Sequence, residues 1–411
     1  MYRTLRFSEN LFAAISLFFF SGALVSVLIG LPSELNPDPD SALMRSIFLL
    51  IYLVTLLLLI LRWEKTLKRL RKHQWIFFLV ILALVSTLWS SVPDITFRKS
   101  IALTGSTLFA VYFGAHYDFD RQLKVLGWMF GFSMILSVMF VALLPTYGLM
   151  DTAGKAWRGI YTHKNGFGEN LFITFTTFYF LSKRVKKYRF MFKLVCVFSA
   201  ILIYLANSAT SLISIVFIYV AAKVLGYSSL RSRSSVFLTL VFLFLGFLIS
   251  LLLTTNFNAF LEANNRDVTL TGRIPLWETL WEFIKMKFWF GYGYGAFFSG
   301  LHTETQLLWR VHSWKPPHAH NGLVRILLDL GFAGFSIFVL GYFYNVGKSL
   351  WLYLIKKDIK VLWTFSLLLY ATIFNFSEVS FLSINQLNWI LSLASIYSLS
   401  SEVGVGRNVE K

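Results

Sequence analysis

The 411-residue chain is 56% hydrophobic and 14% charged, whereas an ordinary soluble protein is roughly 45–50% hydrophobic and about 25% charged. This composition excludes a soluble globular protein. The formal net charge of +18 is not a nucleic-acid signature, because the basic residues gather in short loops. Segments 62–72 and 183–193 hold six each, which is typical of cytoplasmic loops that meet anionic lipid.

Successive runs of about 17–25 apolar residues are each long enough to cross a hydrocarbon core of roughly 30 Å. Backbone groups in lipid must be satisfied within their own segment, so these runs are predicted to be helices. The sequence therefore predicts an all-α polytopic membrane protein with about twelve transmembrane helices. The predicted spans lie near residues 11–31, 42–61, 75–90, 100–115, 123–144, 167–182, 194–206, 209–226, 236–254, 321–345, 361–376 and 385–399.

The topology follows from where the positive charges lie. Twelve spans place both termini on one side, and on that assumption the inside segments hold about 25 Lys and Arg residues and the outside segments about 11. Both termini are therefore predicted to be cytoplasmic. The first apolar run is long and has no small-residue exit, so it is predicted to be a span and not a cleaved signal peptide. No repeat of 20–50 residues is present, and we expect one integral membrane domain, residues 1–411.

The segment 255–320 is the longest polar interval of the chain, and it is predicted to be a large, partly helical periplasmic loop between helices 9 and 10. Apolar residues recur at helical spacing from Pro275 to Phe290. This pattern predicts a helix that lies along the membrane interface or one that seals the bundle. The glycine run 291–295 permits a tight turn, whereas its match to a phosphate-binding loop is weak without a preceding strand.

Four polar motifs are predicted to lie at the outer ends of helices. Planar guanidinium groups bind phosphate oxygens bidentately, and helix N-termini near Asn165 and Asn321 add positive dipole ends, so this set suits a diphosphate. An outer arginine can also be a headgroup contact or a solvated side chain. The motifs are 89–98, which contains Arg98; 157–166, which contains Arg158, His163, Lys164 and Asn165; 271–273, which contains Arg273; and 318–321, which contains His318, His320 and Asn321.

His320 is the strongest candidate for a proton acceptor, since an unperturbed imidazole titrates near pH ~6.5 and is largely neutral at neutral pH. The alternative is a structural histidine that caps the following helix. A zinc site built on His318 and His320, with help from His302, Glu304 or His312, is a further alternative. The spacing of these residues matches no specific metal signature, so no metal and no cofactor is predicted.

Three other sets of charged residues have structural interpretations, and one of them also has a functional alternative. Arg325 and Asp329 lie one helical turn apart in an apolar run, where charges are costly unless they are paired or face a cavity. They form either a mutual ion pair or a site arginine that its aspartate orients. The paired aspartates at 38–40 and 118–120 are predicted to be structural, the first in a turn and the second on the cytoplasmic side.

Together these motifs resemble the Wzy-type polymerase and O-antigen ligase superfamily of bacterial envelope glycosyltransferases. The segments 158–165, 269–277, 290–295 and 318–322 occur in the family's order, and His320 and Gly331 have the family's spacing of a histidine, ten residues and a glycine. Segment 89–98 resembles the branch that polymerises exopolysaccharide. The spacing from Arg273 to the next leucine, Leu276, is short for the family, so whether Arg273 or Arg158 takes the main arginine role stays open.

The resemblance implies a metal-independent, inverting transferase of the bacterial inner membrane with a periplasmic active site. Its donor would be an undecaprenyl-diphosphate-linked oligosaccharide, and its acceptor a glycan or glycolipid. His320 would deprotonate the acceptor hydroxyl, while Arg158 and Arg273 would bind the diphosphate leaving group. The resemblance also implies the lipid bilayer, a flippase and a chain-length regulator as partners, and no nucleic acid. Further substrate-binding candidates are Arg98, His163, Lys164, Asn165, His318, Asn321 and Arg325.

Two functions within the family differ in the acceptor. A polymerase adds a growing chain to another lipid-linked repeat, whereas a ligase moves a finished chain to lipid A-core. Segments 163–165 and 89–98 favour the polymerase. A secondary transporter is an alternative from another class of membrane protein. Transporters of this size commonly divide into two related halves with polar residues at the midplane, and neither feature is evident in the sequence.

Overall fold

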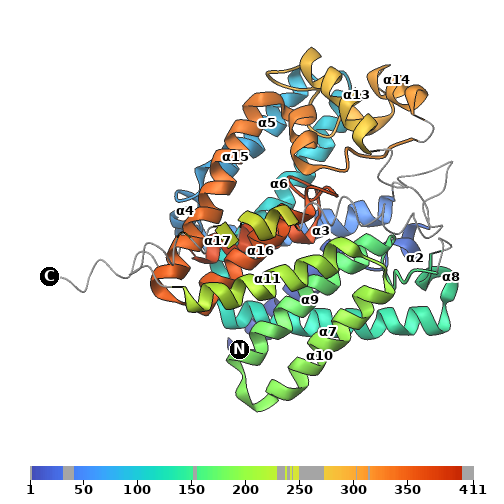
Figure 1. Ribbon diagram of the computed structural model, residues 1–411. Helices are drawn as coiled ribbons and strands as arrows, with labels where there is room; N and C mark the ends of the chain where they lie inside the picture. Colours follow the sequence, from blue (N-terminus) through green and yellow to red (C-terminus); the bar gives the residue numbers. More distant parts are fainter. Residues whose placement is uncertain are drawn as a thin grey trace.

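The computed structural model describes residues 2–30, 41–150, 155–228, 237, 241–242, 244–249, 273–301, 303–312 and 315–399. These residues are mostly helical (Figure 1), and within them one isolated antiparallel bridge joins Leu149 to Trp157. The α-helices are α1 (Tyr2–Phe20), α2 (Val25–Ile29), α3 (Ala42–Ile60), α4 (Trp63–Leu70), α5 (Gln74–Val85), α6 (Pro93–His116), α7 (Phe119–Leu143), α8 (Pro145–Gly148), α9 (Lys164–Arg184), α10 (Arg189–Leu205), α11 (Ala209–Tyr227), α13 (Arg273–Met286), α14 (Thr303–Val311), α15 (Gly322–Lys356), α16 (Ile359–Phe374) and α17 (Leu387–Leu399). Short 3-10 helices occur at η1 (Ser86–Leu88), η2 (Lys186–Tyr188) and η3 (Phe297–Ser299).

Five of the described helical stretches are long and apolar enough to cross a membrane, and these are α3, α7, η2 with α10, α11 and α15. Helices α4 and α5 would form a sixth as one span bent by 92°. The apolar helices α16 and α17 are shorter. The chain is thus an all-helical, multi-pass membrane protein, as predicted, while the count of twelve spans and the periplasmic loop stay predictions. The predicted span 236–254 lies largely outside the described residues.

The first predicted span, 11–31, is broken in the structure. Helix α1 ends at Phe20, and a turn with Gly22 at φ 76° and Leu24 at φ 60° leads to the short α2. The Leu24 N–H donates to the carbonyl of Ile160 at 2.9 Å. This bond satisfies a backbone group that the break frees from the helix, and it ties α1 to the segment that precedes α9.

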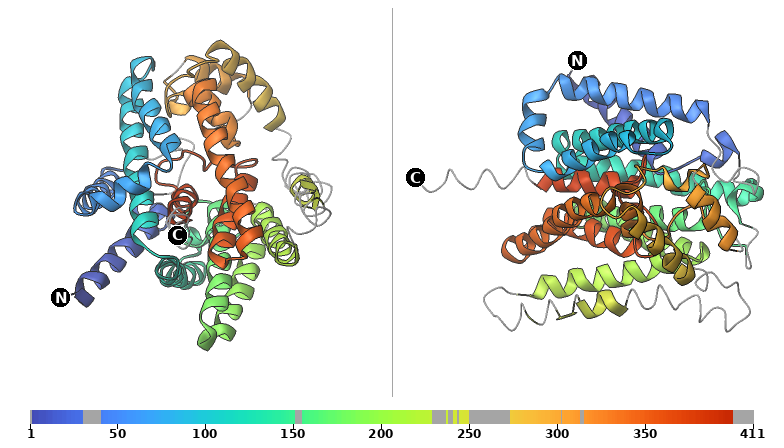
Figure 2. Two further views of the ribbon diagram at one scale, coloured as in Figure 1. Left: turned by 90° about the vertical axis from the view of Figure 1, so that its left-hand side faces the viewer. Right: turned by 90° about the horizontal axis from the view of Figure 1, so that it is seen from above.

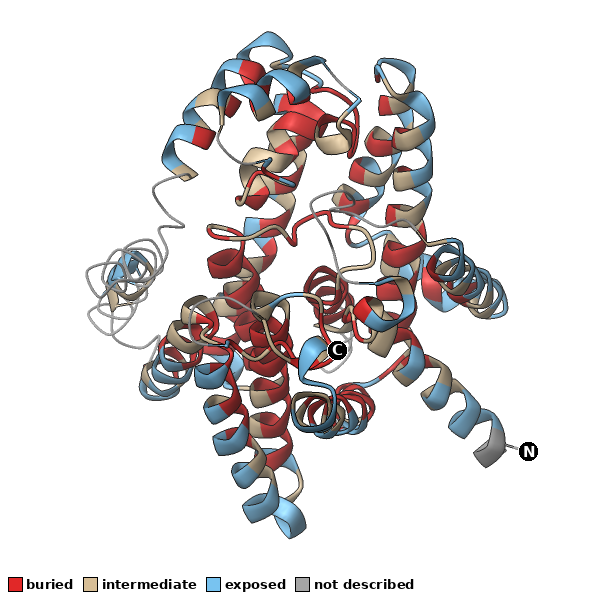
Figure 3. Cartoon of the chain, turned by 90° about the vertical axis from the view of Figure 1, so that its right-hand side faces the viewer, coloured by how far each residue is buried: buried red, intermediate tan, exposed pale blue. Residues whose placement is uncertain are grey.

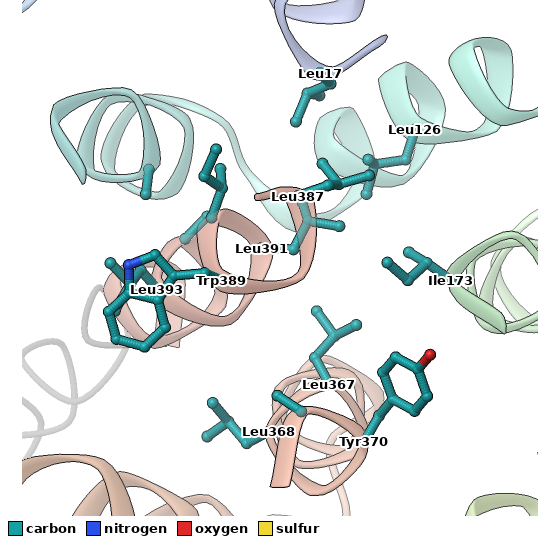
Figure 4. Close-up of a cluster of buried hydrophobic side chains, with 14 of the residues drawn as sticks. Leu17, Leu126, Ile173, Leu367, Leu368, Tyr370, Leu387, Trp389, Leu391 and Leu393 are labelled. Atoms are coloured by element: carbon teal, nitrogen blue, oxygen red, sulfur yellow. The ribbon is translucent and has the colours of Figure 1, made fainter. Parts of the chain in front are cut away.

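Helix α17 lies at the centre of the bundle. Figure 4 shows its side chains Leu387 and Leu391 among residues of α1, α7, α9 and α16, and all its residues from Leu387 to Tyr397 are buried. Figure 3 shows the same division across the whole fold, with buried positions inside and exposed ones on the outer faces. A helix that is apolar on every face needs other helices around it, which explains why α16 and α17 occupy the interior.

Helix α15 is interrupted at Gly331, which has φ 63° and ψ −164°. The interruption frees backbone groups, and the glycine turn before η3 satisfies them. Tyr292 N–H donates to the Leu328 carbonyl at 2.8 Å, and Gly293 N–H donates to the Asp329 carbonyl at 3.0 Å. On the other side of the break, the Phe332 N–H donates to the carbonyl of Phe288, which precedes the turn, at 2.7 Å. The glycine run therefore completes a broken helix, and its amides are not arranged as a phosphate loop.

We expect Gly331→Ala to destabilise the protein strongly. A Cβ at this position would lie 2.4 Å from Phe290 N, and the left-handed φ adds strain of about 1–3 kcal/mol. Gly347→Ala on the same helix is the matched control, because its Cβ would meet nothing within 4 Å and alanine is the better helix former by about 1 kcal/mol. Thermal unfolding in detergent should show a clear loss of Tm for the first variant and none for the second. Equal Tm values would contradict the role of the break.

Helices α13 and α14 pack together beside the first part of α15, at the upper right of Figure 1 and away from α4. Helix α13 begins at Arg273 and buries Leu276, Leu280, Phe283 and Ile284, which form a second small core with the glycine turn and α15. Trp281 is 50% exposed on the opposite face. Of the two alternatives for this amphipathic segment, the buried face fits a helix that packs on the bundle.

The connection between α16 and α17, residues 375–386, is fixed against the start of α15. Asn375 accepts hydrogen bonds from the backbone N–H groups of Ser380 and Phe381, both at 2.8 Å. The backbone carbonyl of Asn375 accepts from the Gly322 N–H at 2.8 Å. A Cβ on Gly322 would lie 2.1 Å from Asn375 Oδ1, so this close approach requires glycine. The contact places Glu378 beside the residues that precede α15.

Candidate functional site

His320 lies in the short segment that leads into α15. The helix is capped by Asn321, whose Oδ1 accepts from the N–H groups of Leu323 and Val324 at 2.9 and 3.2 Å. The capping alternative for His320 therefore does not apply. His320 has φ 49°, a left-handed conformation that is uncommon outside glycine. Trp277 of α13 donates its indole N–H to the Ala319 carbonyl at 2.8 Å, so α13 and α15 together hold the histidine in this conformation.

Three polar side chains from separate parts of the chain meet at Glu378. Asn165, in the first turn of α9, donates to Oε1 at 2.7 Å. The Arg273 guanidinium, at the start of α13, lies 3.7 Å from Oε1. His320 Nδ1 lies 3.9 Å from Oε2. The side chains of Arg273, His320 and Glu378 are 12%, 17% and 14% exposed, so the cluster is largely shielded and still reachable.

His318 and His163 adjoin this cluster. The His318 and His320 rings lie 4.1 Å apart, and His318 Nδ1 accepts from the His320 N–H at 3.2 Å. His163 caps α9, since its Nδ1 accepts from the Asn165 N–H at 3.2 Å. Lys164 is the first residue of that helix and is half-buried. The structure thus brings together most of the motifs that the sequence analysis placed at the outer ends of helices.

Burial lowers the pKa of His320 to about 2, and the adjacent His318 and the positive Arg273 contribute to the shift. Burial also lowers the pKa of His318 to about 3, with Arg325 and Arg273 adding to it. Burial raises the pKa of Glu378, and Arg273 and Asn165 partly oppose this shift. The two imidazoles are therefore neutral at physiological pH.

Arg158 is buried and already holds backbone groups. Its Nε donates to the Tyr147 carbonyl at 2.9 Å, and one terminal nitrogen donates to the Thr146 carbonyl at 2.7 Å. Arg273 differs, because its guanidinium makes no hydrogen bond to the described residues. Its ion pair with Glu378, at 3.7 Å, is longer than the hydrogen bonds of Arg158. Of the two arginines, Arg273 therefore keeps more donors available for a ligand.

Two other candidate residues have structural contacts of their own. Arg98 lies on the exposed face of α6, with its Nε 3.4 Å from the Asp94 carbonyl. Arg325 pairs with Asp329 at 3.3 Å and donates to Ser383 at 3.2 Å. Arg325 is thus in the mutual ion pair that was one of its two alternatives, and it helps to hold the 375–386 connection that carries Glu378. Thr271, Gly272 and His302 lie outside the described residues.

Glu378 is the residue that the sequence analysis missed. It stands between the apolar runs of α16 and α17, and an ionisable residue at such a place is by itself a functional candidate. One helical turn after Asn165, Glu169 of α9 is buried and accepts from Gln386 at 2.9 Å. The sequence signal was present, but nothing in the sequence says that Glu378 faces His320 and not another helix.

His318, His320 and Glu378 also have a geometry that a metal ion could use, since one donor atom from each lies within 4.8 Å of the others. Two features oppose this use. Arg273 already places a positive charge 3.7 Å from the same carboxylate, and His318 Nδ1 is engaged by the His320 N–H.

We therefore expect the transferase activity that the resemblance implies to survive dialysis of the purified protein against EDTA. Added Zn²⁺ should not raise the rate, because Arg273 and the engaged His318 Nδ1 oppose a metal ion at this site. The measurement is the transfer rate before and after chelation, with metal content checked by mass spectrometry. Activity that disappears with EDTA and returns with one metal would contradict the metal-free site.

The fold and this cluster define a class, a helical membrane protein with a shielded arginine, histidine and carboxylate site at one end of the bundle. The family model described as O-Antigen ligase matches residues 194–339, which include Arg273 and His320. The chain is also similar to the exopolysaccharide production protein ExoQ of Rhizobium meliloti, at 23% identity over 294 residues. The similar region is 67% of this chain and 65% of ExoQ. These two findings confirm the resemblance to the Wzy-type polymerase and O-antigen ligase superfamily.

Proposed function

We propose that the protein is a membrane glycosyltransferase that polymerises polysaccharide repeat units carried on a lipid diphosphate, such as undecaprenyl diphosphate. The observation that carries the proposal is the convergence of Arg273, His320 and Glu378. Such a site combines a neutral base, an anion-binding guanidinium and a carboxylate that can orient both. Similarity to an exopolysaccharide production protein supports the polymerase.

The reaction assigns one role to each member of the cluster. The acceptor sugar hydroxyl gives its proton to His320 Nε2 as its oxygen attacks the anomeric carbon of the donor. The bond from that carbon to the diphosphate breaks, its electron pair stays on the diphosphate oxygen, and the configuration inverts. Arg273 binds the leaving diphosphate with two N–H groups and stabilises its developing charge. No metal or cofactor takes part in this scheme.

Glu378 is proposed as the positioning residue. Its Oε2 lies on the Nδ1 side of His320, and a carboxylate there favours the tautomer with the proton on Nδ1, which leaves Nε2 as the acceptor. The distance of 3.9 Å exceeds a hydrogen bond, but catalytic hydrogen bonds are often long before the substrate binds. Asn165 donates to the other carboxylate oxygen, so the start of α9 orients the Glu378 carboxylate beside His320.

The low pKa of His320 predicts a pH dependence. In the free protein Arg273 and burial hold this pKa at about 2, and a bound diphosphate would compensate the positive charge of Arg273 and raise it. The acid limb of kcat, which reports the bound complex, should therefore lie at higher pH than the acid limb of kcat/KM. In rates measured from pH 4 upward, kcat should therefore show an acid limb, whereas kcat/KM should show none from His320. Two limbs that coincide near pH ~6.5, the value of an unperturbed imidazole, would contradict this assignment.

The family match to O-Antigen ligase keeps a second function in view, transfer of a finished polysaccharide to lipid A-core. The two functions leave different intermediates in a strain that lacks the protein. Single lipid-linked repeats should accumulate if it polymerises, whereas long lipid-linked polymer beside bare core should accumulate if it ligates. Glycan profiling of the deletion strain, complemented by the wild type or by His320→Asn, tests both. An unchanged profile would exclude both functions and favour the transporter alternative.

The proposed topology places the site in the periplasm and both termini in the cytoplasm of a bacterial inner membrane. The support is the basic character of the opposite end, where segments 62–72 and 183–193 lie. A flippase that delivers the donor and a chain-length regulator are the proposed protein partners, because the reaction consumes an exported lipid-linked repeat.

A further inference from the structure

A cavity of about 120 Å³ opens at the end of the bundle away from His320. Its walls come from α4, the connection between α6 and α7, the first turns of α16 and the last turn of α17. In Figure 1, α4 lies at the left-hand side and α13 and α14 at the upper right. Helix α16 joins the two regions, since Lys360 lines the cavity and Asn375 lies fifteen residues on, roughly 22 Å along a helix.

The cavity has an excess of positive charge. Lys65, Arg69 and Lys360 line it, and the carboxylate of Asp118 is the one acidic group among its described lining residues. That carboxylate caps α7, because it accepts from the Arg121 N–H at 2.8 Å. The lining of the cavity thus holds three cations and one carboxylate, which is engaged at the start of α7.

Two neighbouring arginines are paired with carboxylates outside the lining of the cavity. Arg62 forms an ion pair with Glu9, and Arg184 pairs with Asp120 at 2.6 Å. The first turns of α7 and α16 also line the cavity, and helix N-termini carry partial positive charge. A cavity, three cations and two helix starts thus favour the same kind of ligand, an anion with several acceptor oxygens.

Helix α4, which lines this cavity, has the features of a helix at the depth of lipid headgroups. It is bent by 92° from α5, so it lies across the end of the bundle instead of crossing the membrane with α5. Figure 2 shows α4 at that end from two further directions. Trp63 and Leu67 of α4 are 59% and 41% exposed, and an exposed tryptophan on a short basic helix is typical of the membrane interface.

We propose that this cavity binds a phosphate group, held by Lys65, Arg69 and Lys360. An anionic phospholipid and a soluble phosphate compound offer the same chemistry, and the interfacial position of α4 favours the lipid. Arg69 also donates to the Tyr397 carbonyl at 2.8 Å, so it already joins α4 to α17. A phosphate between Arg69 and Lys360 joins α16 to the same pair and stabilises this end of the bundle.

The experiment uses the full-length protein in phosphatidylcholine nanodiscs, with phosphatidylglycerol or inorganic phosphate added as probes. The test variant is Lys65→Gln with Lys360→Gln. The control is Lys68→Gln with Lys186→Gln, two exposed lysines of segments 62–72 and 183–193, whose loss removes the same charge outside the cavity. Native mass spectrometry counts bound phosphatidylglycerol, and thermal unfolding reports the stabilisation by either probe.

We expect phosphatidylglycerol to raise the Tm of the wild type and the control, and the test variant to bind it roughly tenfold more weakly or worse. Stabilisation by inorganic phosphate that the test variant loses, without an effect of the lipid, supports the site and assigns it a soluble ligand. Equal binding by the test variant and the control overturns the proposal, because general surface charge then explains the attraction. No effect of either probe on the wild type overturns it as well.

Discussion

His320→Asn is expected to abolish transfer while the protein stays folded. Asparagine tolerates the left-handed φ of 49° at this position, so the variant removes the imidazole without the backbone strain that alanine would add. A positioned general base contributes about 10²–10⁴-fold to the rate, and the rate should fall by that factor. The measurement is polymer formed from a lipid-linked donor by purified protein in nanodiscs.

His312→Asn is the matched control for this prediction. His312 follows α14 and lies 3.3 Å from the Thr279 hydroxyl, outside the cluster around Glu378. Its loss should leave the transfer rate and the Tm close to those of the wild type. If His320→Asn kept wild-type activity in the same assay, the general-base role would have to move to another residue.

Arg273→Lys and Arg158→Lys are expected to fail in different ways, and the comparison decides which arginine binds the diphosphate. Lysine keeps the charge at residue 273 but loses the two-pronged contact with phosphate oxygens. Removing such transition-state stabilisation costs about 10²–10³-fold in kcat, whereas the Tm should change little. The same two measurements, kcat and Tm, apply to both variants.

For Arg158→Lys the larger change should be in stability. Two nitrogens of the Arg158 guanidinium hold the carbonyls of Thr146 and Tyr147, and one ammonium cannot reproduce that planar pair of contacts. Each buried carbonyl that loses its donor costs about 1–3 kcal/mol, so the Tm should fall clearly while the folded fraction stays active. A stable Arg158→Lys protein with a collapsed kcat, beside an active Arg273→Lys protein, would reverse the assignment.

The helical membrane fold was readable from the sequence because it depends on local properties. Apolar runs of sufficient length must form helices in lipid, and most of the predicted runs are helical in the described residues. The breaks were not readable. The turn after Phe20 depends on a contact with Ile160, and the 92° bend between α4 and α5 depends on packing at one end of the bundle.

The candidate site was also readable in part. His320, Arg273, Asn165 and His318 were singled out by residue type and by their place beside apolar runs, and the structure brings them together. Their partner Glu378 was overlooked, since its importance depends on the turn that Asn375 holds against Gly322. The glycine run was weighed as an anion loop, whereas its Tyr292 and Gly293 amides pair with the carbonyls freed at Gly331.

By itself the sequence determined that the chain is a helical membrane protein, where its basic loops lie, and which polar side chains stand at the ends of apolar segments. Each of these follows from composition and spacing along one segment. Only the tertiary structure decided that α9, α13, α15 and the turn after α16 converge on one carboxylate. It also decided that Arg158 supports a backbone segment while Arg273 stays available. These outcomes depend on how separate helices pack, and the distances between them are not encoded in any single stretch of residues.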